Sequence, residues 1–158
     1  MKRMVAAVAV AAVAIVILCA GAARAGSGPA NLSCEAKPGQ KSPVTLKGLI
    51  PDSEETLDIT LSDGSASIRM TDADADTHRI EALEQSGFSI IIERKQVYGR
   101  VTLYAIPKTV KARKGPHRTH ATFDAVLLAP NPQHEGSVRS AGDMLPKLKM
   151  SCTYDYEL

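Results

Sequence analysis

The chain has 158 residues, a formal net charge of +2, no tryptophan and only two phenylalanines. Three of its 19 Lys and Arg residues, but none of its 17 Asp and Glu residues, lie among the first 25, so the remainder holds 16 basic and 17 acidic residues. A near-neutral chain of this kind has no overall positive field to attract nucleic acid or an anionic membrane surface. We therefore expect neither as a partner.

The first 25 residues have the pattern of a secretory signal peptide. Lys2 and Arg3 form a positive start, residues 4–20 are an apolar run, and Ala23-Arg24-Ala25 is a small-x-small cleavage site. Cleavage after Ala25 leaves 133 residues, which is the length of one ordinary domain. The sequence thus predicts a single exported domain over 26–158, periplasmic or secreted, with no stable membrane span once the leader is removed.

Two alternatives for the leader are an uncleaved membrane anchor and a lipoprotein signal. An anchor needs about 20 strongly apolar residues, whereas this run is rich in weakly apolar alanine. A lipoprotein signal would make Cys19 the acylated residue and requires a small residue before it, where this chain has Leu18. Both alternatives therefore rank below the soluble exported form.

The exported domain begins with two short segments of alternating polarity. The segment around Cys34 is followed by the turn-forming residues Lys37-Pro38-Gly39-Gln40. Val44 and Leu46 then alternate with polar residues, and we expect Gly48 and Pro51 to end that strand. Both segments are predicted to be β-strands.

The clearest hairpin signal lies between residues 56 and 70. Apolar residues alternate on both sides of Asp63-Gly64, a dipeptide that suits the positive φ angles of a type I′ turn. We therefore predict two antiparallel strands joined by a type I′ turn at Asp63-Gly64.

Asp72-Ala73-Asp74-Ala75-Asp76 follows and has the spacing of the start of a calcium loop. The sixth position is Thr77 where that motif has glycine, and the twelfth is Leu83 where it has a bidentate glutamate. We therefore predict no metal site. We interpret the segment as a solvated turn that leads into a short helix over 77–86, with a strand over 79–82 as the alternative.

The second half of the domain continues the strand pattern. Residues 88–94 and 100–105 are predicted to form a second hairpin, 109–113 an edge strand protected by its basic residues, and 119–128 a further strand. Residues 129–144 have no regular pattern. A loop of that length is uncommon in a compact domain and is either functional or merely mobile.

The final segment alternates strictly in polarity from Lys147 to Leu158 and carries Cys152 on its apolar side. Cys34 also lies on an apolar side, and export favours oxidation of the pair. We predict a Cys34–Cys152 disulfide between the first and last strands. Turn signals every eight to twelve residues or so predict an all-β fold, an antiparallel sandwich or barrel with at most one short helix.

The sequence contains no catalytic signature that we can identify. It has no Gly-x-Ser-x-Gly, His-Glu-x-x-His, Cys-x-x-Cys or glycine-rich phosphate loop. His120 and Asp124 share a face, but along one strand they are too far apart for a hydrogen bond. We expect no enzymatic activity and no cofactor.

The charged residues are unevenly distributed along the chain. Residues 52–76 hold eight acids and one base, whereas 94–118 hold mostly bases. The two regions neutralise each other in the fold, present separate docking surfaces, or are ordinary solvated charge on exposed strand faces, which is the more common case. We predict that the basic region and the 131–143 loop form the contact surface for an envelope or secreted protein, through Lys108, Lys111, Arg113, Lys114 and Arg118.

The expected function is that of an exported binding module, inhibitor-like or adaptor-like. The alternatives are a structural or assembly factor of the cell envelope and a carrier of a small ligand. The sequence leaves the oligomeric state open.

Overall fold

A computed structural model describes residues 29–40, 43–51, 56–95, 99–134 and 143–157. The predicted leader and parts of several loops lie outside the described residues. The described chain is nearly all β-structure, as the alternating polarity predicted. Its only other regular elements are two short 3₁₀ turns, η1 (Leu83–Gln85) and η2 (Pro132–His134).

Ten strands make up the fold, and most carry buried residues at every second position, as half-buried strands do. They are β1 (Ala30–Ala36), β2 (Thr45–Ile50), β3 (Asp58–Ser62), β4 (Ser67–Thr71), β5 (Ala75–Ala82), β6 (Gly87–Arg94), β7 (Arg100–Ala105), β8 (Lys111–Lys114), β9 (Arg118–Leu128) and β10 (Leu148–Glu157).

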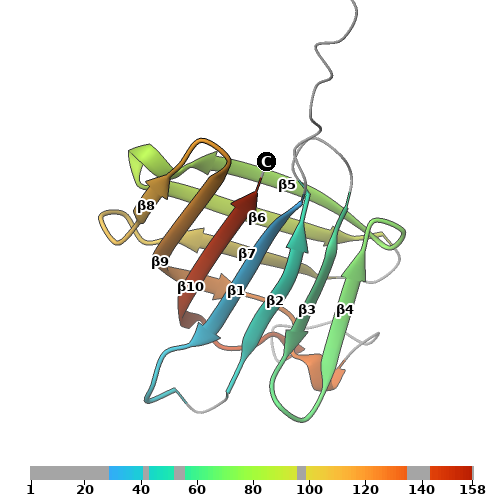
Figure 1. Ribbon diagram of the computed structural model, residues 1–158. Helices are drawn as coiled ribbons and strands as arrows, with labels where there is room; N and C mark the ends of the chain where they lie inside the picture. The colour runs from blue at the N-terminus through green and yellow to red at the C-terminus, as the bar shows by residue number, and fades with distance from the viewer. Residues whose placement is uncertain (1–28, 41–42, 52–55, 96–98, 135–142, 158) are drawn as a thin grey trace, which may run out of the picture.

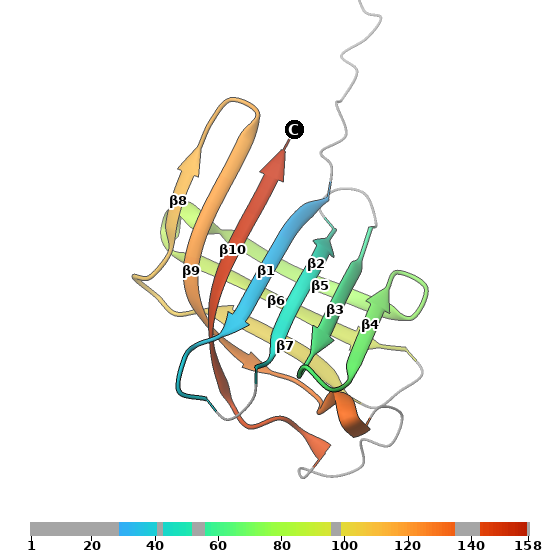
Figure 2. The same ribbon diagram turned by 60° about the horizontal axis from the view of Figure 1, so that its bottom comes forward.

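The strands form one antiparallel sheet that bends back over itself into an open barrel. Its order is β4-β3-β2-β1-β10-β9-β7-β6-β5, and β8 pairs with β9 beside β7. In Figure 1, β5, β6 and β7 form a layer behind the other strands and run across them. Figure 2 shows the same crossing from another direction. The long strand β9 connects the layers because it pairs with β10 along one edge and with β7 and β8 along the other.

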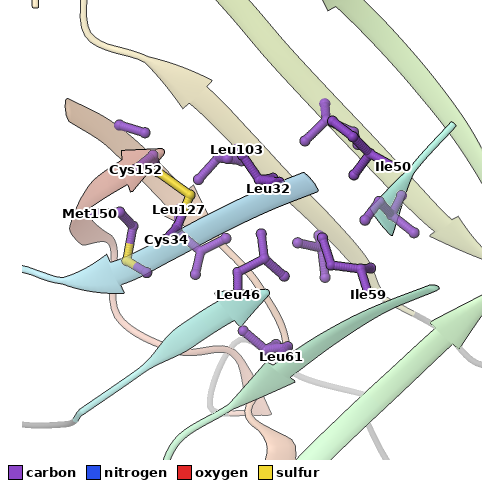
Figure 3. Packing of buried hydrophobic residues seen from close by; sticks show 14 of the residues in the cluster. Leu32, Cys34, Leu46, Ile50, Ile59, Leu61, Leu103, Leu127, Met150 and Cys152 are labelled. Carbon is purple, nitrogen blue, oxygen red and sulfur yellow. A yellow bond between two sulfur atoms is a disulfide. The ribbon is translucent and has the colours of Figure 1, made fainter. Parts of the chain in front are cut away.

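The hydrophobic core fills the space between the layers. It is built from aliphatic side chains together with Phe88, Phe123 and Tyr154, whose rings pack against one another at centroid distances of 5.1 and 5.7 Å. Figure 3 shows the inward side chains of β1, β2 and β3 meeting those of the opposite layer.

The predicted disulfide is present within this core. Cys34 of β1 lies directly opposite Cys152 of β10, and the bond links the two neighbouring strands. Both cysteines are buried, so the bond is shielded from solvent. The prediction that the first and last strands are joined is therefore confirmed.

Two local predictions are wrong, and a third is wrong in part. Residues 77–86 do not form a helix: β5 runs to Ala82 and only the turn η1 follows. The Asp63-Gly64 connection is not a type I′ turn, because Gly64 alone has positive φ and four residues separate β3 from β4. The strand expected to end at Gly48 and Pro51 continues past Gly48 and ends at Ile50, directly before Pro51. Gly48 lies within β2 and brings β3 close, since a Cβ atom there would be 2.0 Å from the carbonyl oxygen of Asp58.

Candidate binding surface on the β8–β9 hairpin

The most exposed strand of the protein is β8, the edge strand predicted from its basic residues. All four of its residues are solvent-exposed, and it pairs only with the first half of β9 among the described strands. Figure 1 shows β8 and the start of β9 at the outer margin of the front layer. The hairpin therefore presents both its side chains and one backbone edge to solvent.

The five predicted contact residues do not act as one group. Lys111 and Arg113 lie opposite Thr122 and His120, so their side chains lie on the outer face of the sheet. Lys108 precedes them in an exposed turn. In the described part of the chain, these three basic side chains take part in no ion pair or side-chain hydrogen bond.

The other two predicted residues are paired within the fold. Lys114 lies on the opposite face of β8 from Arg113, and its Nζ is 3.7 Å from Glu84 Oε1. Arg118 lies 3.0 Å from an oxygen of Asp155 and 3.5 Å from one of Glu157. The surface that is free to attract an anionic partner is therefore formed by Lys108, Lys111 and Arg113, which we call the basic triplet.

Lys108 has an unusual backbone conformation for a lysine. Its φ is +69°, and the amide of Thr109 donates to the carbonyl of Ile106 across Pro107 and Lys108. The third position of such a turn favours glycine, because a side chain there crowds the backbone. The turn therefore carries local strain while it displays the lysine beside β8.

A shallow hollow of about 380 Å³ lies on the outer face beside this turn. Lys108 and Lys111 line one side, and Thr122, Asp124 and Ser151 line the rest. The acid in this hollow is already engaged, because Asp124 forms an ion pair with Lys37. The hollow thus presents two lysines and neighbouring hydroxyl groups, a combination suited to anionic oxygen atoms.

A second depression, of about 310 Å³, lies between β8 and η1. Ala112 and Lys114 contribute from β8, Thr119 from β9, and Ala82, Leu83 and Glu84 from the end of β5 and η1. Its lining mixes charged and polar side chains with the apolar residues Ala82, Leu83 and Ala112, and it lies on the core-facing side of β8. We call it the η1 cleft.

His120 takes part in an interaction that the sequence analysis missed. Its Nδ1 lies 2.8 Å from Asp155 Oδ1, and Asp155 is opposite His120 on β10. The hydrogen bond from His120, with further support from Arg118, holds the pKa of Asp155 below its usual range. Analysis of single strands could not identify this partner; pairing the 119–128 strand with the last strand would have done so.

The described start of the 131–143 loop lies away from the basic triplet. This start, η2, contacts β4, and Gln133 donates to Asp63 Oδ2 at 2.7 Å. In both views η2 lies below β4, at the other end of the molecule from β8. The structure therefore does not bring this start of the loop and the basic edge together, and residues 135–142 lie outside the described residues.

The acidic and basic regions of the sequence meet at one corner of the fold. Lys95 Nζ is 3.3 Å from Asp76 Oδ1 and donates to the carbonyl of Asp72. Other acids of the region have local roles: Asp58 binds Arg69, and Asp74 accepts the amide of Thr71. Internal neutralisation thus involves Lys95 but does not extend to the basic triplet.

The Asp72–Asp76 segment does not have the arrangement of a metal site. Asp72 Oδ1 accepts the amide of Leu57 and Asp74 Oδ1 that of Thr71, so these carboxylates stabilise the turn between β4 and β5. In the described ranges there is no group of three or more His, Cys, Asp or Glu residues arranged to hold a metal ion.

The comparisons with known proteins found no relative. No family model, no curated protein and no solved structure matches this chain. Within the described residues, no helix has both the length and the apolar character needed to cross a membrane.

Proposed function

We propose that this protein is an exported, non-catalytic binding module that recognises an acidic surface of an envelope or secreted protein through the basic triplet. The observation that carries the proposal is the contrast within the hairpin. Lys114 and Arg118 have acidic partners inside the fold, whereas Lys108, Lys111 and Arg113 have none within the described chain.

Two features, a rigid platform and a local excess of positive charge, support a role in binding. The triplet lies on a disulfide-linked barrel, which presents a rigid platform to a partner. The near-neutral balance of the exported domain makes this group of bases a local feature. Unpaired surface charges mainly raise association rates and exclude partners of the wrong sign.

The oxidised cysteine pair and the leader pattern both favour the periplasm or the extracellular space.

Affinity capture from envelope extract tests this proposal. The oxidised protein, a K111E/R113E variant and a matched K147E/K149E variant serve as baits. The control reverses two exposed lysines near and within β10 that lie outside the triplet. We expect a protein enriched on the native bait to be retained by the control and lost by K111E/R113E, with the melting temperature of all three baits nearly unchanged. Equal capture by all three baits would contradict the proposal.

A further inference from the structure

The exposed strand β8 has an unpaired backbone edge in addition to its charged side chains. The inference drawn from this edge rests on the proposed function. The backbone of β8 pairs with β9 on one side, and no described strand lies along the other side. An unpaired strand edge is a template on which an extended segment adds as a further strand.

The outer side chains of β8 determine which residues are favourable in the segment that adds to it. Lys111 and Arg113 are two residues apart on one face, a spacing of about 6 to 7 Å along a strand. Alternate residues of an added strand have the same spacing and face their partners at about 5 Å. Carboxylates at alternate positions would therefore lie opposite the two bases.

The other face of β8 limits what lies between those carboxylates. Ala112 is small and lines the η1 cleft together with Ala82 and Leu83, which are apolar as well. A residue between two carboxylates would project toward this side. A small or branched apolar side chain fits there, whereas a further acid would lie near Glu84.

Two described segments of this chain are poor candidates for the strand edge. Pairing β8 with β8 of a second copy would place Lys and Arg residues opposite one another, which is unfavourable. The alternating acids of 72–76 have the right pattern, but Asp72 accepts the amide of Leu57 and Asp74 accepts that of Thr71. Because neither of these described segments fits, the charge of β8 favours an acidic strand from another protein.

We propose that β8 binds an extended segment of a partner protein by strand addition, with acidic side chains at alternate positions opposite Lys111 and Arg113 and an apolar side chain at the η1 cleft. The bases that prevent self-pairing are then the groups that select the partner. Backbone hydrogen bonds supply affinity, and the alternation supplies specificity.

A set of synthetic peptides tests strand addition directly. The probe is a short capped peptide with glutamate and valine alternating. One control has the same composition with the glutamates adjacent, and a second keeps the sequence but carries N-methyl groups on alternate amides. We expect both controls to bind the purified oxidised protein at least tenfold more weakly than the probe. We also expect the probe to slow hydrogen exchange at the β8 amides that point away from β9.

The variants separate this inference from the proposed function. K111E/R113E should abolish binding of the probe, and K147E/K149E should leave it intact. If all three peptides bind equally, or anionic phospholipid vesicles bind through Lys111 and Arg113 while the peptides do not, strand addition is overturned. If the captured envelope protein still requires Lys111 and Arg113 but no peptide binds, the proposed function stands and only the strand mode fails.

Discussion

At the scale of single residues, Asp63 shows how one side chain holds distant segments together. Its Oδ1 accepts from the amides of Ser65 and Ala66, each at 2.9 Å, and its Oδ2 accepts from Gln133 at 2.7 Å. The backbone donors are the main cause of its pKa, which lies well below the ordinary range for a carboxylate. Asp63 therefore fixes both the β3–β4 turn and the start of the 131–143 loop.

Replacing Asp63 with alanine should lower the free energy of unfolding at pH 7 by about 2 kcal/mol, because several donors lose their acceptor. Since folding lowers the pKa of Asp63, its contribution is present above the unfolded value of about 4 and declines as pH falls through the folded value. Urea titrations of wild type and Asp63→Ala at a series of pH values measure this difference.

Asp63→Asn is the matched control for this experiment. It retains one oxygen for the turn amides, so its loss at pH 7 should be smaller than that of Asp63→Ala. A difference between wild type and Asp63→Ala that stays constant from pH 7 to pH 2 would contradict the assignment of this stability to the carboxylate.

At the scale of elements, the Ile106–Thr109 turn holds Lys108 in a strained backbone conformation and exposes its side chain to solvent. Lys108→Gly removes the crowding at φ +69° and should raise the free energy of unfolding by about 1 kcal/mol. The same change removes one member of the basic triplet, so partner binding should weaken. Thermal unfolding and binding assays on one preparation measure both effects.

Lys108→Ala separates the backbone from the side chain. Alanine removes the charge but keeps a Cβ atom in the strained conformation, so it should weaken binding as Lys108→Gly does without the gain in stability. Equal stability of the alanine and glycine variants would show that the turn stores no strain at this position.

The elements also show where sequence reasoning succeeds and where it stops. Strict alternation identified β10, because a half-buried strand has one possible in/out pattern. It misassigned 77–86, where the inward positions of β5 include Arg79 and Glu81 in place of apolar residues. The hydroxyl of Tyr154 donates to Glu81 Oε2 at 2.8 Å. This hydrogen bond gives the charged side chain a partner, so β5 tolerates an acid on its inward side.

The candidate site was predictable in composition but not in arrangement. The basic residues of 108–118 are evident in the sequence, yet which of them are neutralised depends on strand pairing. Arg118 meets Asp155 because β9 and β10 are neighbours, and Lys114 meets Glu84 because η1 lies next to β8. Both contacts join segments far apart in sequence, and no local pattern reports them.

At the scale of the whole molecule, the proposed binding edge lies apart from the contacts that stabilise the fold. The disulfide lies in the core between the layers, and η2 lies against β4 below the sheet. In contrast, β8 lies at the margin of the front layer (Figure 1). A binding strand at the margin can exchange partners without disturbing the core, because its side chains contribute little buried surface.

The disulfide provides the test of this separation. Cys34 and Cys152 close a loop with a sequence separation of 118, for which chain entropy gives a stabilisation of about 4 to 5 kcal/mol as an upper figure. Removing the bond with a Cys34→Ala/Cys152→Ala double variant should therefore lower the free energy of unfolding by several kcal/mol. Because both sulfurs are buried, a reductant should attack the native protein only as fast as β1 and β10 separate.

At a temperature where the double variant is still folded, its affinity for the acidic partner should equal that of the wild type, since β8 contacts neither cysteine. Calorimetric titration beside the thermal unfolding curve measures both quantities. Lost affinity in a folded double variant would mean that the β1–β10 link fixes the geometry of the β8–β9 hairpin through β9, and that the barrel and its binding edge act as one unit.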